Sequence, residues 1–272
     1  MIIDATTNKI YSNNDWRIIM LKSYSSMNFD DPKMMRKAKH NLKAKNCLYQ
    51  NYKKMYENMY RMANKSLKCA SGVEVELGSG GGFFKEINKN VITSDLDKTN
   101  DVDLVINAMD LPFKNNSVKT IYAAHVLHHI PDIDKFFEEV NRCVHSGGGC
   151  VLVEPYWSPL GKFCFKHLHS EAYDDKQKDW KLNSSGPMSG ANQALSYIIL
   201  KRDRKIFNQK YPNLEVIYDR PFNGISYLST GGIWLKPYLP DKVVVVLNKL
   251  EQIFWPFMYL FGVHHMFVIR KK

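Results

Sequence analysis

The stretch at residues 73–82, Val-Glu-Val-Glu-Leu-Gly-Ser-Gly-Gly-Gly, constrains the fold more than any other part of this 272-residue chain. Its first half reads as a buried strand. Its second half is a loop that carries almost no side chains, so backbone can approach a ligand closely. A Walker A loop is excluded because no Gly-Lys-Ser or Gly-Lys-Thr follows, and the dinucleotide-binding fingerprint fits badly because its third glycine would fall on Phe83.

Beyond Gly72 the sequence alternates short β-branched runs with helical stretches. The expected strands are residues 73–77, 91–94, 104–106, 120–124, 150–153, 214–218 and 265–269, with the glycines at 147–149 forming the turn before the fifth strand. The expected helices are residues 83–88, 132–143 and 191–210. Strands that alternate with helices predict a parallel, doubly wound α/β sheet with right-handed crossovers.

Residues 33–68 contain neither Gly nor Pro, and their apolar positions fit one or two amphipathic helices. The Tyr and Met stripe in this segment is more typical of packing than of cofactor contact. The net charge of the chain is +11, and eleven basic residues with a single acid, Glu57, lie in this segment. Such a basic face fits nucleic acid, anionic lipid or an anionic substrate, and it fits equally well a solvated helix face.

About forty residues separate the last two expected strands, and within them residues 241–261 have apolar side chains at helical spacing. Polar residues between 248 and 252, together with Pro256, argue against a transmembrane span. We expect this insertion to cover the functional site. The alternative is a peripheral surface, residues 233–262, that lies on a membrane.

The compartment is indicated by the cysteines and by the first residues. The five cysteines show no CxxC spacing, which favours free thiols in a reducing cytoplasm over a disulfide framework or a zinc site. Residues 1–10 lack the apolar core of a signal peptide. We expect a cytoplasmic protein, with the inner face of the membrane as a peripheral location.

Asp95 follows the expected strand at residues 91–94. A carboxylate at the end of that strand can accept hydrogen bonds from a ribose diol. This position suits an adenosine cofactor and a nicotinamide cofactor alike.

Five segments, in this order, resemble the class I S-adenosylmethionine-dependent methyltransferases (methyltransferase type 11), and most closely the branch with the ubiquinone and menaquinone C-methyltransferases. They are residues 76–82, Asp95, residues 107–113 (Asn-Ala-Met-Asp-Leu-Pro-Phe), residues 125–132 (His-Val-Leu-His-His-Ile-Pro-Asp) and residues 147–149. The resemblance covers roughly residues 72–155. It implies a methyltransferase (EC 2.1.1.-) with a Rossmann-like sheet, mostly parallel with an antiparallel last strand.

The pattern along the chain predicts the domain organisation, and the resemblance implies the cofactor site. Residues 1–71 would form a polar segment and a basic helical cap, residues 72–221 and 263–272 the core, and residues 222–262 a helical insertion. S-adenosylmethionine would bind, leaving S-adenosylhomocysteine as product. Its contacts would be Glu76, Gly78, Ser79, Gly80, Gly82, Asp95, Leu96, Asn107, Ala108, Met109 and His125. Asn107 stands where the family usually has Asp.

Methyl transfer needs a general base only where the acceptor must lose a proton, as hydroxyls usually must. The candidates are His167 and His169, with His129 as a further one. His128 and His129 are adjacent at the start of a helix, so we expect that they do not both face the pocket. No metal site is expected, because His167 and His169 lack a clear third ligand.

The chain also resembles bacterial methyltransferases of surface-glycan and lipid-linked glycan synthesis. This resemblance rests on residues 167–171, residues 184–192 and the apolar insertion, and residues 184–192 suit a loop that touches a polar substrate. It implies O-methylation of a small-molecule, sugar or lipid-linked acceptor. Three alternatives stay open: an RNA methyltransferase that uses the basic segment, an NAD(P)-dependent Rossmann oxidoreductase, and a non-enzymatic module that keeps a cofactor fold as a scaffold.

Overall fold

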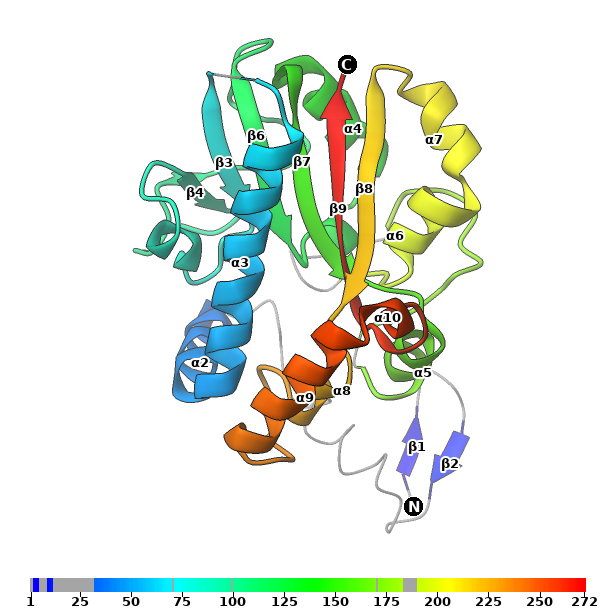
Figure 1. Ribbon diagram of the computed structural model, residues 1–272. Helices are drawn as coiled ribbons and strands as arrows, with labels where there is room; N and C mark the ends of the chain where they lie inside the picture. Colours follow the sequence, from blue (N-terminus) through cyan, green and yellow to red (C-terminus); the bar gives the residue numbers. More distant parts are fainter. Residues whose placement is uncertain are drawn as a thin grey trace.

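The centre of the molecule is a seven-stranded sheet with the strand order β5-β4-β3-β6-β7-β9-β8 (Figure 1). The computed structural model describes residues 2–4, 9–11, 32–69, 71–98, 100–169, 171–182 and 190–272, with side chains from Lys37 onward. The strands are β3 (Val73–Leu77), β4 (Ile92–Asp95), β5 (Leu104–Val105), β6 (Val118–Ala124), β7 (Val144–Pro155), β8 (Leu214–Phe222) and β9 (His264–Lys271). The first five strands in this order, from β5 through β4, β3 and β6 to β7, pair in parallel. Strand β9 runs antiparallel between β7 and β8. The predicted fold class is confirmed.

Alternate side chains of the central strands face two separate cores, because neighbouring residues of a strand point to opposite faces of a sheet. In β6, Ile121 packs in the core that includes helix α4 (Ile133–Cys143), whereas Tyr122 packs in the core that includes helix α3 (Asn46–Ser66). The first core also takes in α7 (Arg204–Lys210). Helices therefore cover both faces of the sheet, and its central strands β6 and β7 are buried on both sides.

The basic segment predicted as one or two helices forms two, α2 (Pro32–Ala44) and α3. The α3 side chains that are buried are Leu48, Met55, Tyr56, Met59 and Ala63. The Tyr and Met stripe therefore packs against the sheet, as expected. At the break between the helices, Lys45 Nζ donates to the carbonyl oxygens of Gly232 and Leu235 in the C-terminal insertion. A separate antiparallel pair, β1 (Ile2–Asp4) and β2 (Lys9–Tyr11), lies near the N-terminus.

Two predicted helices differ from the observed ones. The helix expected at residues 83–88 is a short 3₁₀ turn, η1 (Phe83–Glu86). The single helix expected over residues 191–210 is broken into α6 (Leu195–Tyr197), a π-helical turn η3 (Ile198–Arg202) and α7. The break comes at Asp203, whose N–H reaches back to the carbonyl of Ile198 and whose carboxylate accepts from Trp180 Nε1 at 3.0 Å.

Four strands are longer than predicted, and each extension has a pairing reason. Strand β6 begins at Val118, which pairs with Val73 of β3 and Val144 of β7. Strand β7 begins at Val144 and continues through Gly147 to Gly149, with a register shift against β6, so these glycines lie within the strand. The expectation of a simple turn there was wrong. Strands β8 and β9 pair with each other from Leu214 and Lys271 to Phe222 and His264, which extends both beyond their apolar stretches.

The C-terminal insertion between β8 and β9 is helical, as expected. It contains α8 (Ile225–Ser229), α9 (Asp241–Ile253), η4 (Trp255–Phe257) and α10 (Met258–Phe261). The chain bends by 93° between α9 and the segment from Trp255 onward, next to Pro256. In the described part of the chain no single helix meets the length and apolarity of a membrane span, although this bent pair passes the same test when taken together.

Candidate active site

A cavity of about 630 Å³ lies beyond the carboxyl ends of β3, β4 and β6, where ligands of open α/β sheets bind. The glycine loop and Asp95 line one end. Residues of α3, α8 and the segment 231–238 also line it, and His129, His169 and Glu171 line the other end. The two ends are described in turn.

The glycine loop brings backbone to the cavity because side chains would not fit. Gly78 has φ +64°, and a Cβ on it would lie 2.4 Å from Cγ2 of Val126. Ser79 is buried and its N–H donates to the Ser94 carbonyl at 2.8 Å, which ties the loop to β4. Gly78, Ser79 and Gly80 line the cavity, whereas Gly82 turns the chain against the backbone of Asp101.

Asp95 is held at the rim of this loop. Its carboxylate accepts from the N–H of Gly80 at 2.9 Å and from the N–H of Leu96 at 2.8 Å, and burial raises its pKa. Asp95 and the exposed Leu96 both line the cavity. The carboxylate oxygens keep lone pairs for a ribose diol, which fits the expected contact.

The residues after β5 are placed only partly as expected. Asn107 and Ala108 line the cavity, and the Asn107 Oδ1 accepts from the N–H of Met109 at 3.0 Å. This internal bond shapes the turn and uses one of the lone pairs that we assigned to adenine. Met109 packs against the hydrophobic core and is not among the lining residues, so its predicted cofactor contact is not supported.

Glu76 lies behind the loop and is buried at the end of β3, so it does not line the cavity itself. Burial raises its pKa to about 7, although side-chain hydrogen bonds with Ser79 and Tyr56 oppose the shift. Its Oε2 has no hydrogen-bond partner among the described residues. A buried carboxyl oxygen without a partner is costly, and the ammonium group of a methionine moiety would satisfy it. The residues present therefore fit S-adenosylmethionine.

His125 stands between the two ends of the cavity, directly after β6. Its φ is +60°, its N–H donates to the Val153 carbonyl at 2.8 Å, and its ring lies 4.5 Å from that of His264. Burial lowers its pKa to about 4, so the imidazole is neutral. His125 lines the cavity where a bound methionine moiety was expected.

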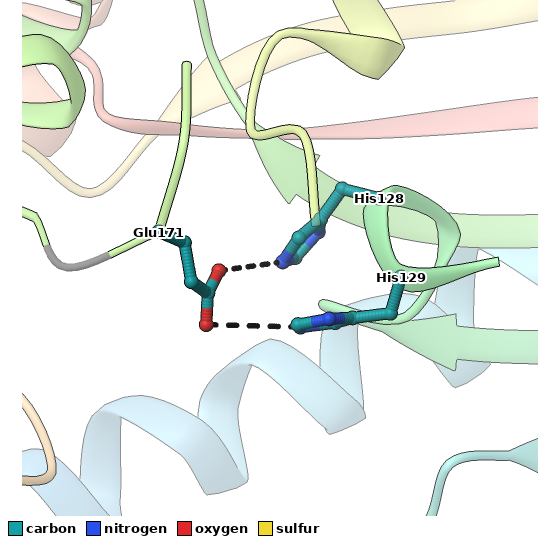
Figure 2. Close-up of side chains that lie close together, drawn as sticks. All are labelled: His128, His129 and Glu171. Carbon is teal, nitrogen blue, oxygen red and sulfur yellow. Dashed lines mark ion pairs between the residues drawn. The ribbon is translucent and has the colours of Figure 1, made fainter. Parts of the chain in front are cut away.

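The far end is organised around Glu171, which faces two histidines (Figure 2). His128 Nε2 lies 3.4 Å from Glu171 Oε2, and His129 Nε2 lies 3.8 Å from Glu171 Oε1. His128 Nδ1 lies 2.5 Å from the buried carboxylate of Glu154, which also accepts from the N–H groups of Val126 and Leu127. Burial opposes a charge on His128, but Glu154 and Glu171 outweigh it and raise its pKa to about 10.

The expectation that His128 and His129 do not both face the pocket was wrong. The two residues lie in a 3₁₀ turn, η2 (Leu127–His129), and both line the cavity, with ring centroids 4.2 Å apart. Successive side chains of such a turn point only about 120° apart, and the cavity is wide enough to take in both rings. Burial and the neighbouring His128 lower the pKa of His129 to about 4, and its Nδ1 has no hydrogen-bond partner within the described residues.

The two other histidine candidates fall in different places. His169 lines the cavity, and its Nδ1 accepts from the N–H of Glu171 at 3.2 Å, so the neutral ring carries its proton on Nε2. His167 is exposed at the end of α5 (Pro159–His167), where its ring lies 5.2 Å from that of Phe163, and it is not among the lining residues. The structure therefore does not support His167 as a base. Of the predicted substrate loop at 184–192, residues 184–189 lie outside the described part of the chain.

Sequence reasoning missed several residues of the far end. Glu171 lies in residues 167–171, which carry one of the family resemblances but predicted no role for Glu171, and its spacing from His169 was the one available signal. Gln193, which donates to Glu171, and His264, which follows the insertion, carried no pattern of their own. Tyr52 and Tyr227 reach the cavity from α3 and α8.

Among solved structures, three similar ones are methyltransferases. A SAM-dependent methyltransferase from Archaeoglobus fulgidus is 15% identical, with a TM-score of 0.47 and coverage of 80% of this chain and 94% of that one. Geranyl diphosphate C-methyltransferase from Streptomyces coelicolor is 14% identical, with a TM-score of 0.45 and coverage of 83% and 81%. A methyltransferase from Mesorhizobium loti is 12% identical, with a TM-score of 0.43 and coverage of 78% and 97%. No curated protein matches the sequence.

The sequence also matches a family model, described as a methyltransferase domain, over residues 75–152. The matched segment contains the glycine loop, Asp95 and His125, and it ends before Glu154, His169 and Glu171. Enzyme class and cofactor are thus confirmed, and the oxidoreductase alternative is set aside. The chain carries a methyltransferase domain over residues 75–152 and is an S-adenosylmethionine-dependent methyltransferase.

Proposed function

We propose that this methyltransferase acts at a membrane surface and methylates a hydroxyl group of a lipid-linked acceptor. The observation that carries the proposal is the apolar surface of the insertion beside the cavity. Exposed large apolar side chains gather there: Val243, Val245, Val246, Leu250, Ile253, Phe254, Trp255, Phe257, Tyr259, Leu260 and Phe261. Exposed apolar patches of this extent mark interaction surfaces.

Helix α9 is oriented opposite to an ordinary surface helix. Its one buried residue is Val244, whereas Val246 and Ile253 are 55% and 68% exposed. Besides Val244, Glu251 faces inward and accepts from the N–H and the hydroxyl of Ser226 at 2.8 and 2.6 Å. A helix that packs through a carboxylate and turns its apolar side outward is suited to an apolar environment.

The same surface continues into the cavity. Ile225 and Tyr238 line the cavity and are 50% and 57% exposed, so the cavity opens beside α8 and α9. Leu228 and Trp234 extend the apolar lining inward. A chain that enters from this side would reach the histidine end without crossing the glycine loop.

Positive charge borders the apolar surface, as expected for contact with anionic headgroups. Lys236, Lys242 and Lys249 are exposed, and the Arg220 guanidinium lies 4.7 Å from the Trp255 ring. Other basic residues serve the fold: Lys39 pairs with Asp101, and Lys45 binds the insertion. We therefore favour lipid over RNA as the partner of the basic charge.

S-adenosylmethionine supplies, when bound, a methyl carbon activated by its sulfonium, so the protein mainly aligns the acceptor and excludes water. Glu76 and Asp95 would hold the methionine and ribose ends. His169 would donate its Nε2 proton to the acceptor oxygen, since its Nδ1 is already an acceptor. The hydroxyl proton would pass to the unprotonated ring nitrogen of the neutral His129 imidazole.

The membrane part is tested by sedimentation with vesicles of phosphatidylcholine containing one third anionic phospholipid. We expect the wild type to sediment with these vesicles. A triple variant, F254S/W255S/F257S, should bind at least about tenfold more weakly, because each substitution removes apolar area that the membrane would bury. Equal binding of both proteins, or retention of RNA in place of vesicles at low salt, would contradict the proposal.

The acceptor part is tested with radiolabelled S-adenosylmethionine and the organic and aqueous extracts of the source cells. We expect label in the organic phase that survives mild alkali, since a methyl ether is stable where a methyl ester is not. Label confined to the aqueous phase would contradict a lipid-linked acceptor.

A further inference from the structure

We propose that the histidine end of the cavity is a metal site. Nε2 of His128, Nε2 of His129 and the carboxylate of Glu171 would bind one divalent transition-metal ion, with Zn²⁺ the best match to this ligand set. The role of the ion toward an acceptor hydroxyl rests on the proposed function. Its binding does not, because the three ligands are all supplied by this chain. The sequence-based expectation of no metal site considered only residues 167–169.

The spacing of the donor atoms suits a single ion. Figure 2 shows both imidazole rings turned toward the Glu171 carboxylate, one ring to each oxygen. All three donor atoms lie within 4.8 Å of one another, with His128 and His129 Nε2 at 3.4 and 3.8 Å from Glu171 oxygens. Ligands of a tetrahedral Zn²⁺ site with bonds of about 2.1 Å are roughly 3.4 Å apart. Little movement is therefore needed to enclose an ion.

The surroundings of the three side chains match those of metal ligands. His128 Nδ1 contacts the Glu154 carboxylate at 2.5 Å, which fixes the ring with Nε2 toward Glu171. A carboxylate behind a ligating histidine is the usual outer contact of zinc sites. Gln193 donates to Glu171, and its Oε1 is buried without a partner among the described residues.

The charge balance also favours a cation. Glu154 is fully buried, Glu171 is mostly buried, and within the described residues both form ion pairs with histidines alone. Buried carboxylates need compensating charge. A divalent ion with neutral imidazoles balances the two acids, whereas one protonated histidine leaves a net negative charge.

The site is open toward the acceptor. His128, His129 and Glu171 all line the cavity, so coordination positions face it. Three protein ligands with an open position are the arrangement of catalytic zinc sites. A hydroxyl bound there would lose its proton more readily, with the proton passing to water and the electron pair staying on the coordinated oxygen.

The test uses the full chain, stripped with a chelator and titrated with Co²⁺, followed by visible absorption and equilibrium dialysis. We expect one Co²⁺ per chain, displaced by Zn²⁺. Glu171→Gln and His129→Gln should each weaken binding at least about 100-fold, and Glu154→Gln about 10- to 100-fold. The matched control His167→Ala removes a nearby exposed histidine and should leave binding unchanged.

S-adenosylhomocysteine affinity measured on each variant shows that it is folded, because the cofactor end is separate. If Glu171→Gln fails this check, His129→Gln decides. Less than one ion per wild-type chain, or binding that persists in the folded variants, would overturn the metal site. Since this readout needs no acceptor, a metal-binding chain that labels no lipid would contradict the proposed function alone.

Discussion

The two ends of the cavity are built in different ways. The cofactor end is backbone: a loop of glycines, tied to β4 by Ser79 and to Asp95 by the N–H of Gly80. The histidine end is made of side chains. Glu171 faces histidines from another segment of the chain, and Gln193 comes from a third segment. The difference teaches that the first end is specified by neighbouring residues, whereas the second exists only once distant segments have folded together.

The largest effect is expected from separating the two ends by mutation. Asp95→Ala should weaken S-adenosylhomocysteine binding about 100-fold, because hydrogen bonds to a charged group contribute about 1.5–3 kcal/mol each. Glu171→Gln should leave this affinity within about twofold of the wild type. Calorimetric titration measures both. Asp179→Ala, which changes an exposed acid outside the loop, is the control. Equal losses of affinity for Asp95→Ala and Glu171→Gln would contradict the separation of the two ends.

The backbone character of the cofactor end predicts a stability effect at Gly78. Gly78→Ala should lower the free energy of unfolding by about 2–3 kcal/mol, from the left-handed backbone cost and the clash with Val126. Gly232→Ala is matched in backbone, with φ +55°, but its nearest atom is 3.8 Å away, so only about 1 kcal/mol should be lost. Denaturant unfolding compares them, and equal losses would refute the steric explanation.

A pH dependence is expected at Glu76 alone of the cofactor contacts. Burial raises its pKa to about 7, so the carboxyl is protonated below that pH and cannot pair with the methionine ammonium. S-adenosylhomocysteine affinity should therefore fall about tenfold from pH 8 to pH 6. Glu76→Gln should bind weakly at both values. A wild-type affinity that stays flat over this range would contradict the role of Glu76.

The smallest effect on stability is expected on the exposed apolar side of α9. Val246→Ala should change the free energy of unfolding by less than about 0.5 kcal/mol, because this side chain is exposed. Val244→Ala on the same helix should cost about 1–2 kcal/mol, since Val244 is buried. Thermal unfolding without lipid distinguishes them. A large loss for Val246→Ala would mean that the apolar side of α9 is packed and not free for a membrane.

The sequence was informative where structure is local. Alternating strands and helices, the glycine loop and Asp95 were predicted from residues within a short span. The antiparallel last strand was predicted through family resemblance. The break at Asp203 was not, because it depends on a hydrogen bond from Trp180. The joint position of His128 and His129 was also missed, since a 3₁₀ turn and an α-helix share the same residue pattern at that length.

The most direct measurement is a crystal structure of the chain with S-adenosylhomocysteine. The account predicts the ribose hydroxyls at the Asp95 carboxylate and the sulfur turned toward His129 and His169, where an acceptor would meet it. A ribose held elsewhere, or a sulfur turned away from these histidines, would contradict the division of the cavity into a cofactor end and a histidine end that receives the acceptor.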